Sequence, residues 1–125
     1  DFDFVLVERM DKRCAFLENE AAILGLKNVS VMKTEAEKIP PESFDLVTFR
    51  AFRPLDKKMA MTLLSIIKKD GTIAAFKAKK TNIQDEMENI QEIVREYKIF
   101  PLRVPFLTES GEPDARERNL VVFGR

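Results

Sequence analysis

The sequence has no histidine, one cysteine and four glycines among its 125 residues. Without histidine, it has no Ser-His-Asp triad, no Cys-His pair and no histidine-ligated metal of its own. Its single cysteine, Cys14, excludes an internal disulfide framework and a multi-cysteine zinc site, and it suits a reducing cytosol. We therefore predict no metal, and chemistry that needs little proton transfer or uses carboxylates, lysines or a cofactor.

Long apolar runs are also absent, and none approaches the length that crosses a bilayer. The acidic, aromatic N-terminus lacks the basic region of a signal peptide. Hydrophobic residues make up 45% and charged residues 34%, the balance of a globular domain, and we predict one cytoplasmic domain without a membrane partner. Basic and acidic residues number 21 each, so a nucleic-acid enzyme would have to gather its cations on one face.

Short apolar runs alternate with segments of helical period. We predict strands over residues 2–7, 29–32, 44–49, 72–77, 98–106 and 119–123. Helices are predicted over 12–26, 56–69 and from Thr81 to Val94, with a single turn at 36–38. Strands joined by single helices imply a parallel sheet, and the last two strands, with no helix between them, imply an antiparallel pair. The pattern thus predicts an α/β, Rossmann-like sheet, mostly parallel, with a C-terminal antiparallel hairpin.

In such a sheet, ligands bind at the carboxyl ends of the strands. Glu8 ends the first strand, where a carboxylate can accept hydrogen bonds from ribose hydroxyls; the alternative is an ordinary loop acid. The Ala36–Glu37 turn can offer N–H groups to an adenine ring, with Glu37 near the adenine amino group, or Glu37 is simply solvated. Arg50 follows the third strand and needs an anion: a cofactor carboxylate, an RNA phosphate or a neighbouring Glu.

Several cations accompany these residues. Lys77 closes the fourth strand and can bind phosphate as a point charge, or it is a surface lysine. Arg118 stands in the polar loop before the last strand, where solvent exposure is the default. Lys12 and Arg13 begin the first helix directly after Glu8, which strengthens the interpretation of that acid as part of a site.

Five stretches of the sequence resemble the RsmG (GidB) methyltransferases: residues 7–17, 24–29, 44–55, 70–77 and 117–123. The most specific parts are the acid followed by Lys-Arg and the Arg-Ala-Phe element after an Asp-led strand. The resemblance covers essentially the whole chain and implies a class I methyltransferase sheet.

The resemblance implies methyl transfer from S-adenosylmethionine to guanine N7 of small-subunit (16S) ribosomal RNA. The residues implied at the cofactor are Glu8, Ala36, Glu37 and Arg50, and those implied at the RNA are Lys12, Arg13, Lys77 and Arg118. No catalytic residue is implied, because guanine N7 has an exposed lone pair and needs no general base. Positioning would supply most of the catalysis.

The sequence departs from the family pattern at three positions. Glu35 replaces an arginine, Phe49 a serine and Ala78 a glycine. No glycine-rich loop occurs, so we expect the family's first strand and that loop upstream of Asp1. Residues 1–125 are then the C-terminal part of one methyltransferase domain, inactive alone.

Two other functions stay open. One is a methyltransferase of the same fold with another substrate, and the other is a non-catalytic nucleotide-binding module. A methylation assay on unmodified small subunits discriminates between the substrates. The upstream sequence discriminates an enzyme from the module, because a strand followed by a glycine-rich turn would restore the enzyme.

Overall fold

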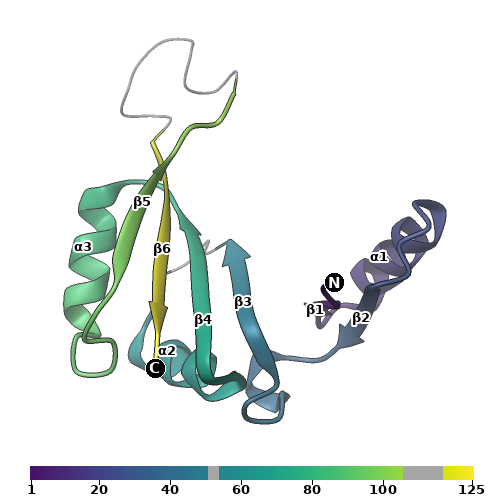
Figure 1. The fold of residues 1–125 in the computed structure, drawn as a ribbon, viewed down its shortest axis with the longest axis horizontal. Helices are drawn as coiled ribbons and strands as arrows, with labels where there is room; N and C mark the ends of the chain where they lie inside the picture. Colours follow the sequence, from purple (N-terminus) through teal and green to yellow (C-terminus); the bar gives the residue numbers. More distant parts are fainter. Residues whose placement is uncertain (51–53, 106–116) are drawn as a thin grey trace. The chain divides into compact units, whose positions relative to one another are not determined.

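The computed structural model of the chain describes residues 1–50, 54–105 and 117–125. It contains two compact units, Asp1–Ile39 (unit 1) and Pro40–Arg125 (unit 2), which are described separately. Its elements are, in chain order, β1 (Phe4–Glu8), α1 (Asp11–Ile23), β2 (Val29–Lys33), η1 (Ala36–Lys38), β3 (Phe44–Arg50), α2 (Lys57–Ile66), β4 (Ile67–Lys77), α3 (Lys80–Asn89), β5 (Lys98–Leu102) and β6 (Arg118–Gly124) (Figure 1). None of the helices in these ranges is long and apolar enough to cross a membrane.

Unit 1 is a parallel strand–helix–strand unit. Strands β1 and β2 pair in parallel from Phe4 opposite Val29 to Glu8 opposite Lys33, with α1 as the crossover that the sequence predicts. Cys14 is buried, and its Sγ donates to the Glu8 carbonyl oxygen at 3.2 Å. Burial raises the pKa of the Cys14 thiol, which suits a packing role.

Unit 2 is a four-stranded mixed sheet in the order β3-β4-β6-β5. Strand β4 is parallel to β3, whereas β6 is antiparallel to both β4 and β5. The predicted antiparallel pair of C-terminal strands is therefore confirmed. One face of the sheet forms the core of the unit, with exposures of 0–3% for Ile73, Ala75, Val121 and Phe123, and buried residues of α2 and α3 accompany it.

The predicted end of the second helix was wrong. Helix α2 ends at Ile66 and β4 begins at Ile67, so Lys68 and Lys69 belong to a strand. The last carbonyl groups of α2 accept N–H bonds from the chain entering β3: Glu42 donates to Ser65 and Ser43 to Ile66, both at 2.9 Å. Because these donors satisfy the helix end, no glycine cap is needed. Glu42 reaches this position with a φ of 55°, in the left-handed region.

Two further boundaries also differ. Gly71 is a buried strand residue instead of a helix stop, and a Cβ placed there would lie 2.8 Å from the Ile67 Cβ, so only glycine fits. Helix α3 ends at Asn89, although Ile90 and Val94 beyond it are buried as predicted. The end of the predicted strand 98–106 falls at Phe106, outside the described residues; β5 itself ends at Leu102.

The opposite face of the unit 2 sheet is exposed in the described part of the chain. Leu46, Phe76 and Phe100 are 56%, 44% and 47% exposed. Strand register places them together, because Phe76 and Phe100 both lie opposite Leu120, and Leu46 lies beside Thr72 on the same side of β4 as Phe76. Sheets with parallel strands usually have both faces covered, so this bare apolar face is unusual.

Candidate functional site

The predicted site residues lie at one end of the strands within each unit. Glu8 is the last residue of β1, and η1 follows the end of β2. In unit 2, Arg50 ends β3 and Lys77 ends β4. These are the carboxyl ends of parallel strands, where open α/β sheets bind their ligands.

Glu8 is held as an oriented carboxylate. Its Oε1 accepts the backbone N–H groups of Arg9 at 2.9 Å and Met10 at 3.1 Å, and its Oε2 lies 3.8 Å from Arg13 Nη1. The Met10 N–H, with smaller contributions from the Arg9 N–H and from the Arg13 cation, lowers the pKa of Glu8 despite partial desolvation. The carboxylate is therefore charged near neutral pH, and its side chain keeps 21% exposure to meet hydroxyl donors.

The turn η1 stands at the same end of unit 1. Thr34, just after β2, donates its N–H to the Glu8 carbonyl oxygen at 3.1 Å, which joins the ends of β1 and β2. The first hydrogen bond of the turn runs from the Lys38 N–H to the Glu35 carbonyl at 3.0 Å. The N–H groups of Ala36 and Glu37 come before that first bond of the turn. Ala36 is half-buried and Glu37 is exposed. Their positions suit the predicted adenine contact.

The two cations of unit 1 that were predicted to meet RNA lie in the first turn of α1. Lys12 and Arg13 are both exposed, and Arg13 faces Glu8 as described. Lys33, at the end of β2, forms an ion pair with Asp11 in the same turn. The structure thus brings Glu8, Lys12 and Arg13 together in one turn of chain.

In unit 2, Arg50 is exposed and lies opposite Phe76 of β4, one residue before Lys77. Lys77 itself is largely buried: its Nζ lies 2.5 Å from Glu86 Oε1, with side-chain exposures of 10% and 14%. Glu86 Oε1 also accepts the N–H of Leu55. A phosphate contact by Lys77 would require this pair to open, so that role stays a prediction.

Sequence reasoning missed Glu86 as the partner of Lys77. The two residues stand nine positions apart on different elements, so no spacing rule within a helix or a strand connects them.

A second polar cluster, also missed, surrounds Arg118. Arg118 Nη1 donates to the Glu117 carbonyl oxygen at 2.8 Å. Asn119, 2% exposed, donates its amide to the Ala78 carbonyl at 2.7 Å and to Glu117 Oε1 at 3.1 Å. The same Oε1 accepts the Lys80 N–H at 2.9 Å. The only sequence signal was a polar Asn at the head of an apolar run.

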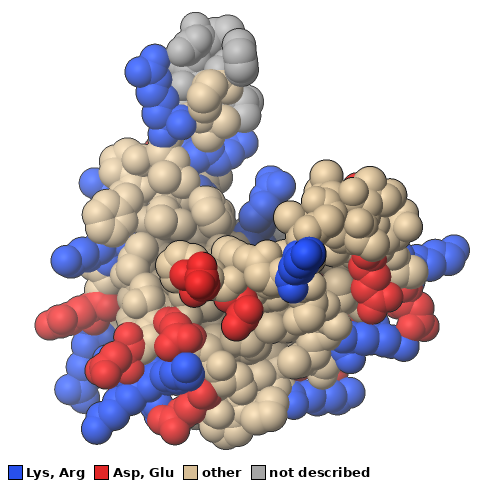
Figure 2. Space-filling view, turned by 45° about the vertical axis from the view of Figure 1, so that its right-hand side comes forward, with Lys and Arg blue, Asp and Glu red and all other residues tan. Residues whose placement is uncertain are grey.

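Basic side chains gather at this end of unit 2. Lys79 and Lys80 are exposed and follow the end of β4 after Ala78. The end of β4 pairs with the start of β6, where Lys77 lies opposite Asn119. In the described part of the chain, Figure 2 shows Lys and Arg side chains toward the top of the unit, whereas acidic and basic side chains mix at its lower left.

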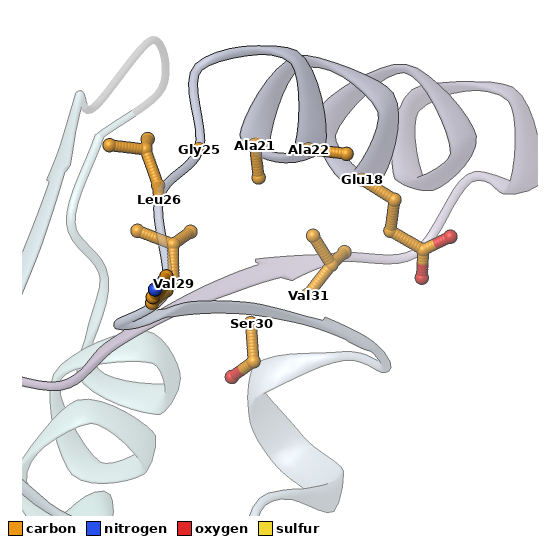
Figure 3. A pocket seen from close by; sticks show the side chains of 9 residues that line it. Glu18, Ala21, Ala22, Gly25, Leu26, Val29, Ser30 and Val31 are labelled. Atoms are coloured by element: carbon orange, nitrogen blue, oxygen red, sulfur yellow. The ribbon is translucent and has the colours of Figure 1, made fainter.

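Unit 1 also contains a cavity of about 380 Å³, which is separate from the predicted site residues (Figure 3). Its lining residues come from the C-terminal part of α1, the following turn and the first half of β2, the end of the strand away from Glu8. It includes none of the predicted site residues. Within the described ranges, no three His, Cys, Asp or Glu residues are grouped to hold a metal.

Comparison with known proteins extends these observations. The family model described as rRNA small subunit methyltransferase G (GidB) matches residues 1–121. Curated relatives called ribosomal RNA small subunit methyltransferase G include one from Treponema denticola, 43% identical over 98% of this chain and 46% of its own length. Another, from Clavibacter michiganensis, is 36% identical over 91% of this chain and 53% of its own length. The chain therefore spans about half the length of these relatives.

Solved structures support the fold. A predicted O-methyltransferase from Agrobacterium tumefaciens superposes with a TM-score of 0.71 at 14% identity, covering 95% of this chain and 60% of its own. The ribosomal protein L11 methylase of Lactobacillus delbrueckii gives 0.69 at 16% identity, covering 98% and 58%. These similarities show the predicted α/β methyltransferase fold. With the family match over nearly its whole length, the chain belongs to the rRNA small subunit methyltransferase G (GidB) family.

Proposed function

We propose that the protein carrying this chain transfers a methyl group from S-adenosylmethionine to guanine N7 of 16S ribosomal RNA in the cytoplasm. The observation that carries the proposal is Glu8, an oriented carboxylate at the end of a parallel strand in a chain of this family. S-adenosylmethionine, when bound, supplies the activated methyl group.

The residues of unit 1 fit the nucleoside part of this cofactor. Glu8 accepts hydrogen bonds from the ribose hydroxyls, because a carboxylate has two acceptor oxygens and the described backbone N–H groups of Arg9 and Met10 use only Oε1. The N–H groups of Ala36 and Glu37 face the adenine ring, with the Glu37 carboxylate toward its amino group. Arg50, exposed at the end of β3 in unit 2, is proposed to meet an anionic group of the cofactor.

Methylation of guanine N7 requires little general acid–base catalysis from the residues of the chain. Guanine N7 presents its lone pair without losing a proton, which suits a sequence with no histidine. The remaining task is to bind and orient the RNA, for which the proposed contacts are Lys12, Arg13, Lys77 and Arg118. Correct orientation of the reacting atoms alone can lower a barrier by about 7–11 kcal/mol.

The test uses a full-length family protein that carries these 125 residues. We expect Glu8→Ala to weaken binding of S-adenosylmethionine by about 10- to 150-fold in calorimetry, because charge-assisted hydrogen bonds are lost. Glu18→Ala, which removes an exposed acid from helix α1 of the same unit, is the matched control and should bind normally.

Activity is measured as methyl transfer to small ribosomal subunits that lack the modification. Incorporation at guanine N7 supports the proposal. Incorporation into protein or into another nucleotide would assign a different substrate, and binding without any transfer would indicate a nucleotide-binding module.

A further inference from the structure

We propose that Glu117 is a positioning residue for RNA binding: it fixes the turn between β4 and α3 so that Lys79 and Lys80 meet RNA phosphates. The inference rests on the proposed function, because it takes ribosomal RNA as the substrate. It adds three residues, Glu117, Lys79 and Lys80, to those already proposed.

The turn is held from its two ends by the start of β6. At one end, the Ala78 carbonyl accepts the Asn119 amide at 2.7 Å. At the other end, the Lys80 N–H donates to Glu117 Oε1 at 2.9 Å. Asn119 also donates to that Oε1 at 3.1 Å and is only 2% exposed, so the anchor for Glu117 is itself fixed. The intervening residue, Lys79, thus has a backbone tied on both sides.

Helix α3 depends on Glu117 for its N-terminus. Its N-cap residue, Lys79, makes no side-chain cap hydrogen bond, and its first turn contains no acidic residue. The first N–H groups of a helix need acceptors from elsewhere, and a carboxylate at this end is favoured by the helix dipole. Glu117, the residue just before β6, supplies both the acceptor and the negative charge. The Lys80 N–H, followed by the Asn119 amide, lowers the pKa of Glu117, so the acceptor is charged near neutral pH.

The held turn presents two exposed lysines at the carboxyl end of β4. Lysine binds phosphate as a flexible point charge, so an ordered backbone reduces the freedom that is lost on binding. The turn connects the tops of β4 and α3 in Figure 1, at the end of the sheet where β6 begins. Among the described residues, Figure 2 shows Lys and Arg side chains toward this end of the unit.

An acid on this surface is unfavourable for RNA by charge alone, which gives the inference a sharp test. If Glu117 acts only through its charge, removing that charge strengthens RNA binding in every variant. If Glu117 holds the turn, the outcome depends on whether the replacement still accepts a hydrogen bond. Glu117→Gln keeps an acceptor oxygen, whereas Glu117→Ala does not.

The experiment measures binding of the full-length protein to small ribosomal subunits at several salt concentrations. We expect Glu117→Ala to weaken binding by about 5- to 10-fold, although it removes a negative charge. Glu117→Gln should stay within about twofold of the parent or bind more tightly. Lys79→Ala should reduce the slope of log affinity against log salt by about 0.7–0.9, as expected for one lost phosphate contact.

Two controls separate positioning from general loosening. S-adenosylmethionine affinity should be unchanged in both Glu117 variants. Ser43→Ala, which removes a 2.6 Å hydrogen bond to the Pro40 carbonyl at the other end of the sheet, should leave RNA binding unchanged.

Tighter binding by Glu117→Ala would overturn the inference while leaving the proposed function intact. Equal weakening by Ser43→Ala would overturn it as well, because the effect would then be general loosening. A parent protein that binds no ribosomal RNA would instead overturn the proposed function, and this inference with it.

Discussion

Replacing Lys77 by Met should destabilise the protein through the partner it leaves behind. Lys77 and Glu86 form an ion pair at 2.5 Å with side chains only 10% and 14% exposed. The variant keeps an unbranched side chain of nearly the same length but removes the cation, so the Glu86 carboxyl loses its ion pair in a largely buried place. Its other described partner, the N–H of Leu55, remains.

Removing one member of a buried ion pair usually costs about 3–5 kcal/mol. Here both side chains keep some exposure, and the Leu55 N–H still serves Glu86, so we expect a loss of about 2–3 kcal/mol. In a protein about twice as long as this chain, as its relatives are, each kcal/mol shifts the melting temperature by about 2–4 °C. The expected shift is therefore about 4–12 °C downward.

Thermal unfolding of the full-length protein is the assay. Lys68→Met is the matched control, because its ion pair with Asp45 is exposed at 52% and 85%, and such pairs contribute about 0–1 kcal/mol. Adding Glu86→Gln to Lys77→Met should restore most of the loss, since the amide oxygen still accepts the Leu55 N–H. Equal melting temperatures for Lys77→Met and Lys68→Met would refute the argument.

Three further predictions follow from the same structure. Arg50→Ala should abolish most methyl transfer without lowering the melting temperature, because the Arg50 side chain is exposed. Arg50→Lys should not restore activity if the contact is bidentate. Full activity of Arg50→Ala would contradict this prediction. The pKa values of Glu8 and Glu117 are lowered in the folded protein, so both carboxylates contribute stability at pH values above their ordinary pKa of 4.5. This stability is lost as the pH falls through the lower pKa values of the folded state. Unfolding measured at a series of pH values should therefore show the loss only in acid, and Glu117→Gln should show less of it. Residues 1–125 alone should self-associate through the exposed apolar face of the unit 2 sheet and through the edge of β3 that pairs with no described strand. Light scattering that rises with protein concentration would show this. A stable monomer that binds S-adenosylmethionine would argue against it.

The fold was largely predictable because its signals are local. Strand-forming runs, helical periods and the lack of a helical sequence pattern between the last two predicted strands correctly gave parallel units followed by an antiparallel pair. The boundary at Ile66–Ile67 failed because the apolar pattern continues through both residues while the structure changes. What ends α2 there is a pair of N–H groups from Glu42 and Ser43, about 23 residues earlier in the chain, which no local pattern reveals.

The candidate site was predictable in part. The sequence placed Glu8, Arg50 and Lys77 at the carboxyl ends of strands, and each does end a strand, whereas their binding roles stay predictions. The partners that define their electrostatics depend on tertiary structure. Only the structure shows that Lys77 forms an ion pair with Glu86 and that Glu117 accepts a hydrogen bond from the first turn of α3, because both contacts join residues of separate parts of the fold.

The fastening of α2 to the chain before β3 has a consequence for hydrogen exchange. The amides of Glu42 and Ser43 lie in an exposed turn, yet each donates to a carbonyl of the last helical turn of α2. They can exchange with solvent deuterium only when that end of α2 and the start of β3 separate. Their protection should therefore match that of the α2 and β4 amides, marking one cooperative opening unit despite their position outside any helix or strand.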